Sequence, residues 1–131
     1  MNALARKWID ALRSGQYKQG QKKLRDGDAF CCLGVLCDIS GLDKWEYCPN
    51  AASYMGFDSI PNRKVLEAAG VRADRIDDRD NTSQFGRSCS ISLKGLPYRY
   101  KTIHELNDLG EVTFDDIADL LEKHQDEIFE P

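Results

Sequence analysis

Three of the five cysteines, Cys31, Cys32 and Cys37, lie within seven positions in the stretch FCCLGVLCD. Clustered thiols can ligate a metal, form disulfides, attack an electrophile or fill a hydrophobic core. Structural zinc sites use two pairs of ligands with short spacings inside each pair, and this pattern is missing. On a helix, Cys32 and Cys37 point about 140° apart and cannot hold one ion. We therefore expect these thiols to fill the core.

Two chemical alternatives for the cysteines stay open at the level of sequence. Cys31 lies in the first turn of a predicted helix, where the dipole favours a thiolate, and His104 is a candidate base. Distant positions can also converge on one metal ion, and the candidates are Cys48, Cys89, His104 and His124. We expect no catalytic residue, no metal site and no cofactor.

A second group of residues combines cations with aromatic rings, as nucleotide sites do. If the N-terminal connection meets a later segment that also holds Tyr98 and Lys101, the two together supply cations for phosphate and flat surfaces for bases. The alternative is a solvated basic surface with tyrosines at the edge of the core. The predicted ligand-binding residues are Arg13, Tyr17, Gln19, Lys22, Lys23, Arg99 and Tyr100.

Composition places the chain among ordinary compact domains. Its 131 residues, 41% apolar and 31% charged, fit one domain spanning 1–131 that buries enough surface to fold without staples. No apolar run is long enough to cross a bilayer, and the amphipathic start does not resemble a signal peptide. We therefore expect a cytoplasmic protein with no membrane partner, whose cysteines are free thiols.

Charge is distributed unevenly along the chain. Residues 1–25 hold seven basic residues and one acid, a net charge of +6, whereas residues 102–131 hold ten acids and one lysine, a net charge of −9. The two ends are expected to attract, either side by side in one chain or across a contact between copies, and we expect a homo-oligomer. The acidic end argues against binding of long duplex nucleic acid.

Hydrophobic periodicity and capping residues predict an α+β fold that is mainly helical, with three or more packed helices and a small β-hairpin. Asp28 and Gly41 are the expected caps of the second helix, Ser59 is the expected cap of the third, and Thr102 and Thr113 begin capping-box patterns. The predicted helices are 3–14, 29–40, 60–69, 103–109 and 114–125, the hairpin is 91–100, and a mobile loop is expected over 72–90.

Three stretches carry a resemblance to a known family: KWIDALRSGQYKQGQKKLR, FCCLGVLCDISG and LNDLGEVTFDDIADLLEKH. With them the chain resembles a family of small proteins encoded by tailed phages and prophages, in which blocks of the form ALRSG.Y.QG, CCLGVLCD and LND.G.TF.IAD recur. These blocks cover close to half of the sequence. Within them, Tyr17, Gln19, Asn107 and Asp108 are the polar positions carried over as candidate ligand contacts.

The resemblance implies a class of function and no catalytic motif. Small accessory phage proteins often counter host defence by sequestering a nucleotide signal or by binding a host protein. The leading hypothesis is a non-enzymatic counter-defence protein, in the cytoplasm of an infected bacterium, that binds and sequesters an anionic small ligand such as a nucleotide. The alternatives are an inhibitor that binds a host defence protein, through the acidic C-terminal helix or the aromatic segment 45–57, and a cysteine-dependent enzyme.

Overall fold

The computed structural model of the chain describes residues 1–48 and 51–131, without the side chains of residues 48 and 80–82. Over these residues the chain folds into a single α+β unit with more helix than strand, which confirms the predicted fold class. The helices are α1 (Ala3–Arg13), α2 (Cys32–Ser40), α3 (Arg63–Ala68), α4 (Ile103–Asn107), α5 (Phe114–Lys123) and α6 (Gln125–Ile128), with a 3-10 turn, η1 (Ala73–Arg75). The strands are β1 (Lys18–Gln19), β2 (Arg25–Asp26), β3 (Ala29–Phe30), β4 (Glu46–Cys48), β5 (Ala51–Ser53), β6 (Ile76–Ser83) and β7 (Gly86–Ile91).

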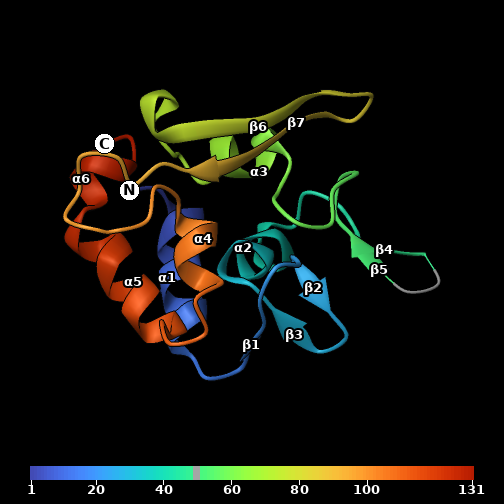
Figure 1. Cartoon of the computed structure of the whole chain (residues 1–131), viewed down its shortest axis with the longest axis horizontal. Helices are drawn as coiled ribbons and strands as arrows, with labels where there is room; N and C mark the ends of the chain where they lie inside the picture. Colours follow the sequence, from blue (N-terminus) through green and yellow to red (C-terminus); the bar gives the residue numbers. More distant parts are fainter. Residues whose placement is uncertain (49–50) are drawn as a thin grey trace.

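Helix α1 packs against both α2 and α5 (Figure 1). Trp8 and Leu12 lie on the inner face of α1, one turn apart, because residues four apart share a helix face. The indole Nε1 of Trp8 donates a 2.8 Å hydrogen bond to the carbonyl of Cys32. The centre of the core is therefore the contact between α1 and the first turn of α2.

The basic and acidic ends of the chain lie side by side within one molecule. The Arg13 guanidinium at the end of α1 forms ion pairs with Asp119 at 2.7 Å and Glu122 at 3.0 Å on α5. Both carboxylates are well exposed, so the pairs add little stability. The opposite charges of the two ends are thus paired within one chain. Self-association stays a prediction, but the charge pattern no longer supports it.

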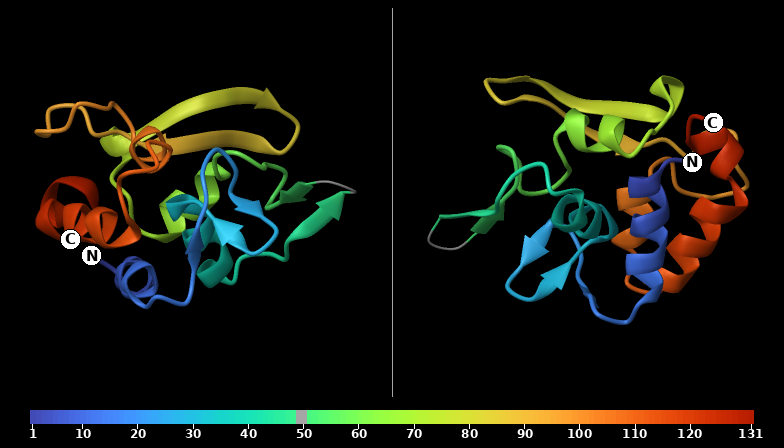
Figure 2. Two further views of the ribbon diagram at one scale, coloured as in Figure 1. Left: turned by 60° about the horizontal axis from the view of Figure 1, so that its bottom comes forward. Right: turned by 180° about the vertical axis from the view of Figure 1, so that it is seen from behind.

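The strands form three small sheets. In the first, β1 pairs with β3 in parallel and β2 pairs with β3 in antiparallel orientation. The other two are antiparallel pairs, β4 with β5 and β6 with β7. In Figure 2 the β6–β7 hairpin lies over α3 and on the opposite side of α2 from the small β1–β3–β2 sheet.

The predicted mobile loop over 72–90 is wrong, because η1, β6 and most of β7 occupy these residues. The predicted hairpin over 91–100 is also wrong: β7 ends at Ile91, and the residues after it form an irregular loop. The polar sequence of β6, IDDRDNTS, does not look like a strand, because Asp77, Asp78 and Arg79 make ion pairs instead of packing in a core. Strand prediction relies on apolar alternation, which this sequence lacks.

Some helix ends differ from prediction by a few residues. The N-cap of α2 is Cys31 and not Asp28, and Asn62 caps α3 in place of Ser59. The Thr113 capping box on α5 is confirmed. Thr102 makes no cap hydrogen bond, because its hydroxyl donates to the Glu105 carboxylate at 2.8 Å.

Candidate functional site

Five of the nine predicted ligand-binding residues line a pocket, and these five are divided between two pockets at opposite ends of α5. Arg13, Tyr17 and Gln19 line a pocket of about 220 Å³ beside the start of α5. Arg99 and Tyr100 line a second pocket of about 280 Å³, formed by the loop after β7. The views in Figures 1 and 2 agree that the two segments are apart. The expected meeting of the N-terminal connection with this later segment does not occur.

Polar groups in the first pocket are already engaged with the protein. The Tyr17 hydroxyl donates to Asp38 at 2.6 Å, and its pKa rises to about 12 through burial and this bond. Gln19 donates its amide to the carbonyl of Val112 at 2.8 Å. Lys22 and Lys23 line neither pocket, and the backbone N–H of Lys22 donates to Asp108 at 2.8 Å. This region is held together by its own contacts.

Asn107 is the centre of that region and is fully buried. Its Oδ1 accepts from the Cys32 backbone N–H at 3.2 Å and from Gln19 Nε2 at 3.1 Å. Its Nδ2 donates to the Gly20 carbonyl at 2.9 Å. One side chain therefore joins the three sequence blocks of the phage-family resemblance. We assign Asn107 a structural role, because burial keeps it from a ligand.

The second pocket, hereafter the loop pocket, gathers charge and aromatic surface around one opening. It is formed by residues 92–101 together with Asp77 of β6. Three cations and two tyrosines face it, and among its lining residues the one acid is Asp77. The side chains that matter chemically are Asp77, Lys94, Tyr98, Arg99, Tyr100 and Lys101.

Backbone hydrogen bonds close the loop that carries this pocket. The Leu93 N–H donates to the Lys101 carbonyl at 2.6 Å, and Ser92 pairs with Thr102 as an isolated antiparallel bridge. Below the loop, the Arg75 guanidinium donates to the Lys94 carbonyl at 2.6 Å. A compact loop with closed ends and a buried Leu93 anchor resembles the Ω-loops that often serve function.

The aromatic side chains of the loop pocket have fixed surroundings. The Tyr98 ring packs edge-on against His124 at the end of α5, with centroids 5.7 Å apart. The Arg99 guanidinium lies 5.8 Å from the centre of the Tyr100 ring. Packing of this kind orients a ring before a ligand arrives, which lowers the entropic cost of binding.

A chain of polar contacts starts in the core beneath this pocket. Buried Ser90 lies 2.7 Å from Nδ1 of His104, and Thr102 Oγ1 lies 3.0 Å from the same nitrogen. Because the Thr102 hydroxyl donates to Glu105, the Ser90 hydroxyl is the donor available to Nδ1. His104 is thereby held in place by β7 and by its own helix.

The same chain continues to the pocket through an arginine. Arg79 Nη2 lies 3.1 Å from Glu105 Oε1 and 3.2 Å from Asp77 Oδ2. One guanidinium thus links α4 with the acidic wall of the loop pocket. Asp77 is held in place without being buried, since 35% of its side chain is exposed.

Stability is expected to depend on the protonation of His104. Burial, followed by the nearby Arg79, lowers the pKa of His104 below 6.5. As the pH falls below 6.5, the imidazole is protonated in the unfolded chain before it is protonated in the folded chain. The contribution of neutral His104 to the free energy of unfolding is therefore complete above pH 6.5 and decreases below it. Urea unfolding at pH 7.5 and 5.5 should show a smaller loss of stability for His104→Gln than for the natural chain. An equal loss in both would contradict this assignment.

The cysteine that caps α2 and the two cysteines inside the helix are buried. Cys31, Cys32 and Cys37 are 2% exposed or less, and burial raises the pKa of all three thiols. Cys31 Sγ accepts the Gly34 N–H at 3.3 Å as the N-cap of the helix. The helix dipole does not compensate for burial, since the pKa of Cys31 reaches about 12.

Cys31 should therefore react slowly with alkylating reagents in the folded protein. With iodoacetamide at pH 7.5, labelling of the peptide that contains Cys31 is expected to be at least about a hundredfold slower in buffer than in 8 M urea, because thiolate is the reactive form. Peptide mapping by mass spectrometry identifies the labelled position. Equal rates in the two solutions would restore the cysteine-dependent enzyme as a hypothesis.

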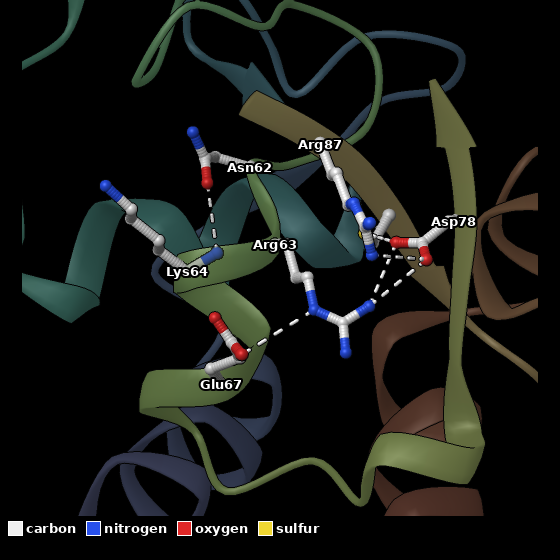
Figure 3. A network of polar contacts seen from close by, with 7 residues as sticks. Asn62, Arg63, Lys64, Glu67, Asp78 and Arg87 are labelled. Atoms are coloured by element: carbon white, nitrogen blue, oxygen red, sulfur yellow. Dashed lines mark hydrogen bonds and ion pairs between the residues drawn. The ribbon is translucent and has the colours of Figure 1, made fainter. Parts of the chain in front are cut away.

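A separate polar cluster around Asp78, Arg63 and Arg87 lies between α3 and the β6–β7 hairpin (Figure 3), and Cys89 of β7 belongs to it. Its thiol donates to Asp78 at 2.8 Å, and Arg63 and Arg87 approach the same carboxylate at 3.0 and 3.4 Å. The thiol hydrogen bond, followed by the pairing with Arg63, holds the pKa of Asp78 below its usual range. Burial and Asp78 raise the pKa of Cys89 to about 12. This cluster attaches the hairpin to α3.

The four-residue metal site considered from the sequence includes Cys48, whose side chain lies outside the described residues. Within the part of the chain that the structure describes, no three ligating side chains are arranged to hold a metal ion. His104 and His124 have separate partners, Ser90 for the first and the Glu127 carboxylate, at 2.6 Å, for the second.

Fold and pocket together define a small single-domain α+β protein with a basic, tyrosine-lined loop pocket. The chain belongs to the family described as a domain of unknown function, DUF8296, whose model matches residues 1–125. Comparisons with curated proteins and with solved structures found no match. None of the helices in the described residues is both long enough and apolar enough to cross a bilayer.

Proposed function

We propose that the protein binds a small anionic ligand of nucleotide type in the loop pocket and holds it without chemical change. The observation that supports this most directly is the convergence of Lys94, Arg99 and Lys101 with two tyrosines on one opening. Cations recognise phosphate, and aromatic rings stack on bases. The chain as a whole carries a net charge of −4, so the cations of the loop pocket form a local positive surface on an acidic protein.

The size of the loop pocket limits the ligand. Its volume of about 280 Å³ is just below the range of about 300–1,000 Å³ that is usual for small-molecule sites. A mononucleotide or a similar phosphorylated metabolite matches that volume, whereas a long strand would contact the pocket with one residue only. The proposal is therefore a single small molecule per protein chain.

Sequestration is the use of such a site that agrees best with the resemblance to small phage proteins. A protein that removes a nucleotide signal in the cytoplasm of an infected bacterium needs affinity and no catalytic group. The burial of Cys31 and Cys32, which raises the pKa of both thiols, is in keeping with this role. Binding of a host defence protein is the second candidate, and exposed Tyr47, with 66% of its surface accessible, favours the aromatic segment as its contact.

The test is calorimetric titration of the purified protein with a panel of nucleoside monophosphates. We expect at least one to bind with a Kd in the micromolar range, and Arg99→Ala combined with Lys101→Ala to weaken it at least about tenfold, since charge-assisted bonds to phosphate contribute about 1.5–3 kcal/mol each. Both side chains are exposed, so the double variant should keep its fold. Lys64→Ala, an exposed cation of α3 outside the pocket, is the matched control.

Two results would contradict the proposal. One is an absence of heat and of thermal stabilisation for every nucleotide in the panel, which would leave the protein-binding candidate. The other is an equal loss of affinity in the double variant and in Lys64→Ala, which would indicate nonspecific attraction. Chromatography of the recovered ligand after incubation distinguishes sequestration, in which it is unchanged, from turnover.

A further inference from the structure

We propose that Asp77 makes the loop pocket selective for guanine nucleotides, an inference that rests on the proposed function. Among the residues lining this pocket, Asp77 is the acid among three cations. It comes from β6, whereas all the other lining residues come from the loop over 92–101. A phosphate is attracted to the cations and repelled by this carboxylate, so the two ends of a bound ligand must differ in chemistry.

The carboxylate of Asp77 is held in place and still accessible. Arg79 pairs with its Oδ2 at 3.2 Å and is itself held by Glu105 at 3.1 Å, while 35% of the Asp77 side chain is exposed. The ion pair engages Oδ2 and leaves Oδ1 and a second lone pair of Oδ2 for other donors. An ionised carboxylate only accepts hydrogen bonds, so the ligand group facing it must offer donors.

Guanine is the base whose edge meets this requirement. Its N1–H and N2–H groups are adjacent donors that one carboxylate accepts in a bidentate arrangement, whereas adenine and cytosine present an acceptor next to their amino group. Tyr98 and Tyr100, which line the same pocket, supply rings for stacking the base. Lys94, Arg99 and Lys101 remain for the phosphate.

A ribose with its two hydroxyls also offers adjacent donors to a carboxylate. This alternative reading of the same geometry predicts selectivity for the sugar and indifference to the base. The two readings differ in their response to 2′-deoxy-GMP, which keeps the guanine edge and loses one hydroxyl.

The experiment is calorimetric titration of the full chain with GMP, AMP and 2′-deoxy-GMP. We expect GMP to bind at least about tenfold more tightly than AMP, because one bidentate pair discriminates by about that factor or more. We expect 2′-deoxy-GMP to bind like GMP. In Asp77→Asn the GMP affinity should fall about tenfold while AMP keeps its affinity or gains, since the amide offers one donor and one acceptor.

The control is Asp74→Asn, which makes the same charge change on η1, at a side chain that is 77% exposed and outside the pocket. It should retain the preference for GMP, and thermal unfolding verifies that both variants fold. Equal binding of GMP and AMP in the natural chain, or an unchanged preference in Asp77→Asn, overturns the role of Asp77 and leaves the proposed function intact. Loss of affinity for 2′-deoxy-GMP alone overturns the guanine reading in favour of the ribose. No binding by any mononucleotide overturns the proposed function itself.

Discussion

Gly34→Ala should destabilise the protein by more than about 3 kcal/mol, although alanine favours a helix over glycine by about 1 kcal/mol. A Cβ built on Gly34 lies 1.7 Å from the Leu24 carbonyl oxygen and 2.6 Å from the carbonyl carbon. Both atoms belong to the backbone, and the same carbonyl accepts the Cys31 N–H at 3.3 Å. The added methyl group fits only if α2 moves away from Leu24, which opens the core.

Urea unfolding followed by circular dichroism measures this effect. Gly20→Ala is the matched control, because its added Cβ meets the Ala29 methyl group at 3.1 Å, a close contact that a displacement of a few tenths of an ångström relieves. We expect that variant to lose less than about 1.5 kcal/mol. A Gly34→Ala protein as stable as the natural chain would show that Leu24 does not pack against α2 in this way.

Asn107→Ala should cost about 3–5 kcal/mol, because several buried polar groups lose their partners at once. The Cys32 N–H, the Gly20 carbonyl and the Gln19 amide all bond to Asn107. The Cys32 N–H belongs to the first turn of α2 and has no carbonyl partner within its own helix. Given a typical total stability of about 5–15 kcal/mol, this variant should be marginal at 37 °C.

Gln19→Ala provides the comparison for Asn107→Ala. It removes one member of the network while Asn107 and its bonds to Cys32 and Gly20 stay, so we expect a loss of about 1 kcal/mol. The double variant should be less destabilised than the sum of the single variants, since the two side chains share a hydrogen bond. Equal, additive effects of the two substitutions would contradict the central role of Asn107.

The structure explains why the stretch FCCLGVLCD has its composition. Gly34 permits the close approach of Leu24, Cys31 caps the helix with its sulfur, and Cys32 and Cys37 fill positions with no exposed surface. Glycine is needed at position 34 because the backbone of Leu24 lies against α2. The thiols of this stretch thus have a packing role, and the candidate ligand-binding side chains lie in the loop pocket.

Local sequence signals were sufficient for α1 and α5. Their apolar residues repeat with the helical period, and the Thr113 capping box defines the start of α5 within six residues of sequence. Such signals come from contacts between residues three or four positions apart. They are therefore visible in a short stretch of sequence. The attraction between the two ends was also visible, although the pairing of Arg13 with Asp119 was not.

The β6 strand and the acidic wall of the pocket were beyond sequence reasoning. β6 has few apolar residues. Asp78 pairs with Arg63 of α3, and Arg79 pairs with Asp77 of its own strand and with Glu105 of α4. Asp77 is fifteen or more positions away from the loop that it faces, and nothing in its neighbourhood marks it. Only the pairing of β6 with β7 brings this carboxylate to the cations.

By itself, then, the sequence determined the fold class, the long helices and the local run of cations and tyrosines from Lys94 to Lys101, because each depends on residues close together in the chain. The tertiary structure decided which of the predicted binding residues share a pocket, and it separated Arg13 and Tyr17 from Arg99 and Tyr100. It also turned Asn107 from a candidate ligand contact into a buried junction of three segments. The physical reason is that burial and long-range hydrogen bonds depend on which segments pack together, and short-range patterns do not encode that choice.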